Sequence, residues 1–488
     1  MSIEKAAARG VVWNIATGMG ARVVSLVGTL VLTRFIAPAD YGEVSAALIC
    51  IQTASVLTFF AFGQYIIAYK SRPSVVSQAS VLHFVLGVVA MAVVYGFRGQ
   101  LGELVEAPNM GRFIGGFAIA HLLDRARSMP ERLLVRELRF RDVAIINSIG
   151  EVTFTAVALA TASRYGGYAI VIGGLVRSTL TFLLFVRKVP RSEWLSFSGV
   201  DWSEARTMFT YGTPLLLVSL CDRASSSWDN VLMLRMFGPS LMGCYALSYS
   251  LAETPVTYVA ERMGDVLMPA FAKMEPQERP GAVVRAAALM SLVVAPLGVG
   301  LGAVAPTLVH AFFDKRWAEM GGILAVLSCM TIFQPASWPT NAYLETEKKP
   351  RLILIASIAR TVSLLAGVAV LGRLGGPIWA CVGVGIGFTV YTVSLVFLTA
   401  MVTPLPIGRY FIACLRPLLA CGPMFVSVFA LRRFFAPMHI PAGIQLGLEV
   451  LLGGVVYIVG TFVFARANVQ ELIGLVRDRR GPASTSTP

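Results

Sequence analysis

The sequence predicts an all-α integral membrane protein with about fourteen transmembrane helices. Three observations support this fold class: a mean hydropathy of +0.71, a charged fraction of only 14%, and a series of apolar runs joined by short loops. An ordinary soluble domain carries roughly 25% charged residues. Lipid must therefore be the solvent for most of this chain.

The individual spans follow from the length of helix that a bilayer requires, about 20 apolar residues for a core about 30 Å thick. The predicted spans are residues 11–33, 44–68, 75–97, 110–130, 143–162, 168–186, 212–237, 245–268, 285–313, 320–344, 352–371, 376–400, 410–431 and 443–465. The span at 110–130 is the weakest, because it contains His121, Asp124, Arg125 and Arg127. Its second half must face a wet cavity or lie partly outside the core.

The distribution of Lys and Arg predicts the orientation of the chain. With the N-terminus in the cytoplasm, 25 of the 41 basic residues fall in cytoplasmic segments and 10 in the opposite loops. This bias satisfies the positive-inside rule and predicts an even number of spans with both termini in the cytoplasm. The composition of residues 467–488 predicts a disordered cytoplasmic tail.

An internal repeat predicts two lobes. Arg22, Arg34, Pro38 and Gly42 are followed, 201 residues later in each case, by a second set of the same residue types. The members of that second set are Arg223, Arg235, Pro239 and Gly243. Six spans separate the copies, so the lobes are expected to be related by a pseudo-twofold axis along the membrane normal. The expected domains are residues 1–200 (helices 1–6), 201–405 (helices 7–12), 406–466 (helices 13–14) and the tail at 467–488.

Four arginines are predicted to lie near the middle of spans: Arg22, Arg177, Arg223 and Arg360. A charge at that depth costs about 2.5–3.5 kcal/mol even on lenient insertion scales. One interpretation is that acids such as Glu151 neutralise them and join helices. The other is a cationic central cavity for an anionic substrate, because guanidinium groups bind phosphate in a bidentate fork.

Polar residues beside these arginines extend the candidate site. Asn14 and Ser25 share one face of the first span with Arg22, which makes them further candidates for substrate binding. Acids in the second half of the chain suggest an ion-coupling site for H⁺ or Na⁺, with neutralisation of nearby arginines as the alternative. These acids are Asp222, Asp229 and Glu253.

Several other function classes lack the residues that they need. No lysine follows a glycine, so there is no phosphate-binding loop of the nucleotide hydrolases, and no nucleophile elbow occurs. The seven cysteines have no metal-ligand spacing, so we expect no metal and no cofactor. The net charge of +14 reflects basic cytoplasmic loops rather than nucleic-acid binding.

Three segments resemble a known family. They are residues 8–14 (ARGVVWN), 32–42 (LTRFIAPADYG) and 131–141 (ERLLVRELRFR). The first two resemble the start and end of helix 1 in bacterial polysaccharide flippases, and the third is typical of the exopolysaccharide branch. The chain thus resembles the Wzx-type oligosaccharide flippases of the multidrug/oligosaccharidyl-lipid/polysaccharide exporter superfamily.

This resemblance implies a non-enzymatic transporter of the bacterial inner membrane, with a two-lobed helical fold. Its expected activity is to move undecaprenyl-pyrophosphate-linked oligosaccharides from the cytoplasmic to the periplasmic leaflet by alternating access. Expected partners are this lipid-linked oligosaccharide, membrane lipids, and polysaccharide polymerase and export machinery. The alternatives are a cation-coupled multidrug exporter of the same superfamily, a lipid II flippase, and a membrane glycan polymerase or ligase.

Overall fold

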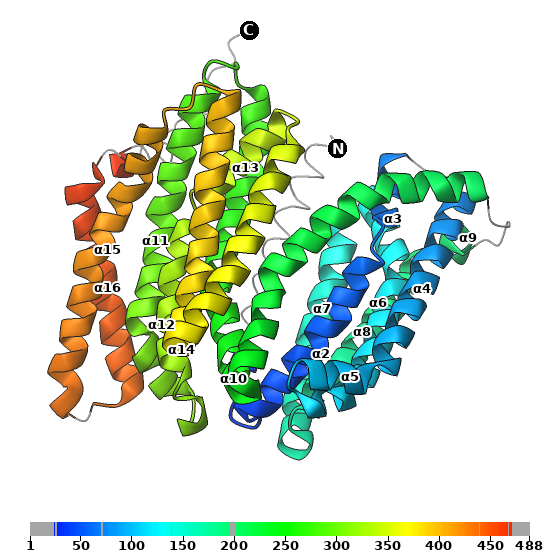
Figure 1. Ribbon diagram of the computed structural model, residues 1–488, viewed down its shortest axis with the longest axis horizontal. Coiled ribbons are helices and arrows are strands. Elements are labelled where there is room, and N and C mark those ends of the chain that lie inside the picture. Colours follow the sequence, from blue (N-terminus) through cyan, green and yellow to red (C-terminus); the bar gives the residue numbers. More distant parts are fainter. Residues whose placement is uncertain are drawn as a thin grey trace, which may run out of the picture. The chain divides into compact units, whose positions relative to one another are not determined.

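The computed structural model describes residues 24, 27–69, 72–137, 139–195, 201–438, 440–466 and 468–470. These residues form helices and no strands, which confirms the predicted all-α membrane fold class (Figure 1). The chain divides into two compact units, residues 1–243 and 244–488. The expected domain boundaries at residues 200 and 405 remain a prediction.

Unit 1 consists of helices that run back and forth beside one another. In chain order they are α2 (Pro38–Leu57), α3 (Phe62–Ala68), α4 (Pro73–Gly96), α5 (Arg98–Leu104), η1 (Pro108–Met110), α6 (Gly111–Arg136), α7 (Phe140–Tyr165), α8 (Tyr168–Lys188), α9 (Arg191–Trp194) and the first part of α10 (Trp202–Lys273). Helix α6 is central to this unit, because it contacts α2, α3, α4, α7 and α8.

Unit 2 contains the rest of α10 and the helices that follow it. They are α11 (Arg279–Phe312), η2 (Lys315–Trp317), α12 (Met320–Met330), η3 (Thr331–Phe333), α13 (Ser337–Thr346), α14 (Pro350–Val402), α15 (Ile407–Phe435), η4 (Ala436–Met438) and α16 (Ala442–Phe464). Helix α11 is the most buried of the membrane-length helices and contacts α12, α13, α15 and α16. Helices α15 and α16 form an antiparallel pair beside it (Figure 1).

The outer faces of the helices are apolar, as lipid requires. On α16, the side chains of Leu451 and Val463 are 67% and 69% exposed. In the described part of the chain, eight helices are long and apolar enough to cross a membrane, or nine if the bent α12–α13 segment counts as one span. The expected number of about fourteen spans therefore remains a prediction.

Glycine–proline pairs divide two of these eight helices. In α10 the break is at Gly238, with φ 79°, and in α14 it is at Gly376, with φ 78°. A proline follows each glycine, Pro239 and Pro377. Glycine adopts positive φ without a Cβ clash, and proline fits the first turn of the next helix, so each pair ends one segment and starts another. The sequence predicts two spans in each of these regions.

Two predicted spans are broken where continuous helices were expected. The span at 44–68 is interrupted after Leu57, and Ala61 there has φ 50°. The span at 320–344 bends by 42° between η3 and α13. Interrupted helices are tolerated in membranes only where other groups satisfy the freed backbone atoms.

The two copies of the internal repeat contact each other reciprocally within unit 1. A Cβ on Gly42 would overlap the carbonyl oxygen of Pro239, and a Cβ on Gly243 would overlap that of Pro38. The proline of each copy thus packs on the glycine of the other. Only a residue without a side chain permits this approach of one backbone to another.

We expect Gly42→Ala and Gly243→Ala each to lower the free energy of unfolding by about 1–3 kcal/mol, because each adds a methyl group where backbone atoms already lie. The double variant should cost less than the sum, since separating the two segments once relieves both overlaps. Thermal unfolding of the purified protein in detergent measures these effects.

Gly454→Ala is the matched control, because no atom lies within 4 Å of the added methyl group. Alanine there should be neutral or stabilising by up to about 1 kcal/mol. Equal melting temperatures for Gly42→Ala and Gly454→Ala would contradict the close crossing.

Candidate functional site

Three of the predicted substrate-binding residues, Arg22, Asn14 and Ser25, lie outside the described residues. The other three are arginines in long helices. Arg177 and Arg223 belong to unit 1, and Arg360 belongs to unit 2. Each has a different kind of partner.

Arg177, on α8, is paired with acids. Its Nη1 lies 3.1 Å from Glu151 Oε1 on α7, and its Nη2 lies 3.9 Å from Asp124 Oδ2 on α6. The pairing with Glu151 is the one that the sequence suggested as the alternative to substrate binding. The Arg177 side chain remains 34% exposed, so pairing with Glu151 does not bury the guanidinium group.

The acids around Arg177 continue into a network that joins α6 and α7. Arg127 contacts Asp124 at 2.8 Å and Glu131 at 3.2 Å, and its Nη1 donates to Asn147 Oδ1 at 3.2 Å. The charged half of the span at 110–130 therefore faces other helices of unit 1. These ion pairs explain how α6 carries so many charges among the other helices of unit 1.

Arg223, on α10, has neutral partners. Its Nη1 donates to Gln52 Oε1 on α2 at 3.0 Å and to Ser227 Oγ at 3.2 Å. It forms no ion pair with any acid in the part of the chain that the structure describes. The side chain is half-buried, so a positive charge lies among the helices with neutral hydrogen-bond partners.

Arg360, on the first segment of α14, lies beside an aromatic ring. Its guanidinium carbon is 4.6 Å from the ring centre of Tyr391 on the second segment. A cation over the face of an aromatic ring is stabilised by the ring quadrupole. The contact also joins the two segments that Gly376 separates.

A buried arginine that the sequence did not single out as a site residue lies in unit 1. Arg125 is only 4% exposed. Its Nη2 donates to Ser55 O at 2.7 Å and to Thr58 Oγ1 at 2.7 Å. Its Nη1 donates to His83 O at 3.2 Å, and its Nε to His121 Nε2 at 3.3 Å. Arg125 thus adds charged donors to the oxygens at the end of α2, where Ser55 O also accepts from Thr58 N.

The predicted coupling acids occupy different environments. Asp222 is exposed, whereas Asp229 is fully buried and its Oδ1 accepts from the backbone N–H of Asn230 at 2.8 Å. Both lie in unit 1, and Glu253 lies half-buried in unit 2. Their role in coupling remains a prediction.

The family-like segment at 131–141 ends in an ion-pair group at the start of α7. Lys188 Nζ donates to the Asp142 carboxylate at 3.0 Å, and Arg139 Nε donates to it at 2.9 Å. This carboxylate joins the start of α7 to the end of α8.

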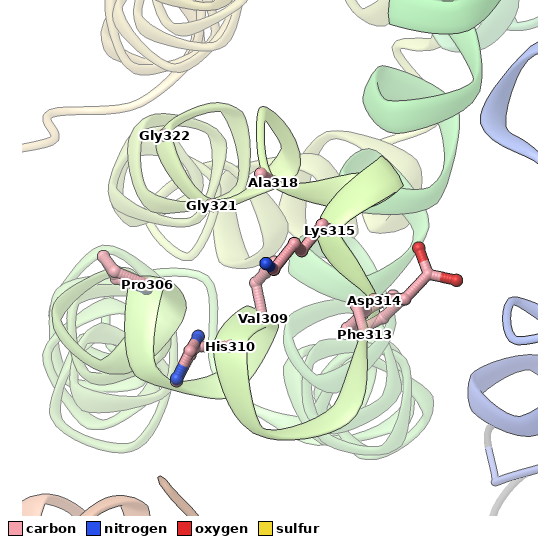
Figure 2. Close-up of a pocket in the computed structure, with 9 residues that line it drawn as sticks. All are labelled: Pro306, Val309, His310, Phe313, Asp314, Lys315, Ala318, Gly321 and Gly322. Carbon is pink, nitrogen blue, oxygen red and sulfur yellow. The ribbon is translucent and has the colours of Figure 1, made fainter. Parts of the chain in front are cut away.

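A pocket of about 520 Å³ lies at the end of α11 in unit 2, and its lining residues include none of these arginines. Figure 2 shows His310 and Lys315 among its lining residues, which also include Pro306, Val309 and Phe313. Among the described residues, no group of three or more His, Cys, Asp or Glu side chains has the arrangement of a metal site.

The fold matches solved membrane transporters. The inward closed conformation of the lipid II flippase MurJ superposes with a TM-score of 0.78 at 14% identity, covering 94% of this chain and 100% of that one. A MATE family multidrug resistance transporter of the MOP superfamily, in its inward-facing conformation, gives a TM-score of 0.55 at 15% identity, over 84% of this chain and 96% of that one. The helices and this fold define the class of protein as a multi-pass membrane protein with the fold of these transporters.

A match to a protein-family model identifies the family of the chain. The profile described as "Polysaccharide biosynthesis protein" matches residues 31–322, more than half of the chain. The chain belongs to this family, which confirms the family predicted from its three segments.

Two curated relatives match nearly end to end. The succinoglycan biosynthesis transport protein ExoT of Rhizobium meliloti is 23% identical over 98% of this chain and 97% of its own length. The lipopolysaccharide biosynthesis protein WzxC of Escherichia coli is 22% identical, over 88% of each chain. These relatives agree with the prediction of a transporter rather than an enzyme.

We expect Glu151→Gln and Arg177→Gln each to lower the free energy of unfolding. The double variant should lose about 0.5–1 kcal/mol less than the sum of the two single variants, because it leaves neither partner unpaired. The coupling is this small because both side chains are about one-third exposed. If Arg177 also binds substrate, polysaccharide export should stay lost in the double variant. Thermal unfolding and surface polysaccharide measure the two effects. Full export by the double variant would leave Arg177 a structural role only.

We expect both Arg125→Leu and Arg125→Lys to be less stable than wild type, even though lysine keeps the positive charge. An ammonium group cannot reach all the separated acceptors that the planar guanidinium contacts, and each lost hydrogen bond to a charged group costs about 1.5–3 kcal/mol. Arg206→Lys, at an exposed position of α10, is the control and should be neutral. A wild-type melting temperature for Arg125→Lys would contradict this assignment.

Proposed function

We propose that this protein is a flippase that moves undecaprenyl-pyrophosphate-linked oligosaccharide repeat units from the cytoplasmic to the periplasmic leaflet. It works by alternating access through a cationic central cavity and supplies exopolysaccharide or O-antigen assembly. Its membership of a polysaccharide biosynthesis family and its likeness to a succinoglycan transport protein support this proposal.

The observation that carries the proposal is the environment of Arg223. Its partners are the neutral Gln52 and Ser227, so no described acid cancels its charge. A guanidinium at this depth is costly unless something anionic binds it for part of the cycle. Arg177 differs, because Glu151 already balances it.

The chemistry of the substrate fits such a residue. A pyrophosphate headgroup carries several negative charges and offers pairs of oxygens to a guanidinium fork. Its lipid tail can stay in the bilayer while the headgroup crosses. A cationic drug would instead favour acids in the cavity, which places the multidrug exporter second.

The protein lies in the bacterial inner membrane with both termini in the cytoplasm, and it works with polysaccharide polymerase and export machinery. Asp222, Asp229 and Glu253 couple transport to H⁺ or Na⁺. Replacing each acid by its amide should then reduce the dependence of export on the ion gradient.

The test is complementation of a deletion strain with wild type, Arg22→Ala, Arg223→Ala and the double variant. We expect each single variant to lose surface polysaccharide and to accumulate the lipid-linked precursor, because the headgroup loses a cationic partner. Gel analysis of the polysaccharide and of extracted lipid precursor measures both, and an immunoblot of membranes confirms equal expression.

Arg206→Ala is the matched control, since Arg206 is an exposed arginine on the same helix as Arg223. It should export normally. Normal export by the double variant would show that both arginines are structural and would remove the cationic-cavity mechanism while leaving the fold intact.

A further inference from the structure

The pocket at the end of α11 combines apolar walls with basic side chains. Pro306, Val309 and Phe313 supply apolar surface, and His310 and Lys315 supply nitrogen atoms (Figure 2). Its volume of about 520 Å³ is typical of a site for a small-molecule ligand, roughly 300–1,000 Å³. Both basic side chains are exposed, so a ligand that enters the pocket can reach them.

The positive charge of Lys315 is not balanced within the pocket. The acid that lines the pocket, Asp314, is held by Arg316, whose Nε donates to Asp314 Oδ2 at 3.0 Å and whose backbone N–H donates to Oδ1 at 2.9 Å. Figure 2 shows the Asp314 carboxylate pointing away from the Lys315 ammonium. Lys315 itself forms no ion pair in the part of the chain that the structure describes. The pocket therefore offers a cation to a ligand.

A buried tryptophan fixes the segment that carries Lys315. Trp317, in η2, is fully buried, and its ring centre lies 6.0 Å from that of Phe313. The Trp317 backbone N–H donates to Asp314 O at 3.0 Å, which closes the turn around Lys315. A lysine held on a defined turn loses less conformational entropy when it binds a ligand than one on a free loop.

The start of α12 forms another wall of the pocket. Gly321 and Gly322 lie in the first turn of this helix, and the N-cap residue Glu319 makes no side-chain hydrogen bond to that turn. The N-terminal end of a helix carries a partial positive charge. Because the two glycines have no side chains, an anion held by Lys315 can lie close to this end.

The pocket extends from a polar connection into a helix of membrane length. Helix α11 ends at Phe312, and Pro306 lies six residues earlier, about 9 Å further along the axis. The charged turn at residues 314–319 joins two predicted spans, which places it next to the hydrocarbon core, where lipid headgroups lie. The basic end of the pocket is thus expected at the depth of lipid phosphates, and its apolar part at the depth of the first lipid carbons.

We propose that this pocket binds the phosphate group of an anionic membrane lipid. Lys315 and His310 donate to the phosphate oxygens, and Pro306, Val309 and Phe313 contact the first carbons of the lipid. A lysine ammonium is a common phosphate ligand, and imidazole donates through a ring N–H. Inorganic phosphate has no carbon atoms to cover the apolar walls, so the walls favour a lipid.

Photocrosslinking of the full-length protein in phosphatidylcholine vesicles tests this site. The probe is phosphatidylglycerol with a diazirine on the first carbons of one acyl chain, present below saturation, and mass spectrometry locates the labelled residues. Wild type should be labelled within residues 306–322. Lys315→Gln should lower this labelling about tenfold, because a charge-assisted hydrogen bond to the phosphate is lost.

Two further variants separate the pocket from general attraction of anionic lipid. Arg433→Gln removes one charge from an exposed position of the same unit that does not line the pocket, and it should label like wild type. Ala318→Trp fills the pocket from an exposed position of its wall without changing the charge, and it should abolish labelling. Wild type without a label in this segment, or full labelling of Lys315→Gln or Ala318→Trp, would overturn the proposal.

Unlabelled competitors identify the source of the phosphate. Competition by phosphatidylglycerol but not by undecaprenyl pyrophosphate would assign the pocket to a phospholipid, independently of the proposed function. Stronger competition by undecaprenyl pyrophosphate would assign it to the lipid-linked substrate, an assignment that rests on the proposed function. Inorganic phosphate that competes as well as either lipid would overturn the proposal. Failure of wild type to complement a deletion strain would count against the flippase and leave the labelling result standing.

Discussion

The cost of placing charge within lipid governs the rest of this structure. Each ionised side chain at the bilayer centre costs about 2.5–3.5 kcal/mol or more, so each needs a partner, a ligand or a proton. Unit 1 uses opposite charges for Arg177 and Arg127, and backbone and hydroxyl oxygens for Arg125. Arg223 is the exception there, because its described partners are neutral side chains. The function that we propose follows from that exception.

The backbone faces the same constraint, and the structure resolves it locally. The breaks in α10 and α14 occur at glycine–proline pairs, where a residue that tolerates positive φ precedes one that lacks an N–H group. The break after α2 has no such pair. There the guanidinium of Arg125 donates to the carbonyl oxygen of Ser55 and to the hydroxyl of Thr58. A charged side chain on α6 thus adds to the turn hydrogen bonds at this break, where Ser55 O also accepts from Thr58 N.

The sequence predicts the features that depend on periodic or local patterns. Apolar runs predict the helices, and the fixed offset of 201 residues predicts the pairing of Pro38 and Gly42 with Pro239 and Gly243 as equivalent positions. The contact between these copies needs the packing of helices distant in sequence. The pairing of Arg177 with Glu151 joins consecutive helices and is one of the two interpretations that the sequence offers. The role of Arg125 was missed because its acceptors lie on helices distant in sequence. A charged letter in an apolar run shows that a partner is needed, but the rotation of neighbouring helices decides which one.

Arg223 and Arg177 show two ways in which a group of helices can hold a guanidinium group. Glu151 balances the charge of Arg177 within the protein, so this pair needs no ligand. Gln52 and Ser227 give Arg223 hydrogen bonds without a negative charge. A guanidinium remains charged at any relevant pH, so the charge of Arg223 can be balanced only by an anion. In the flippase that we propose, that anion is the substrate headgroup, which must bind and leave once in each cycle.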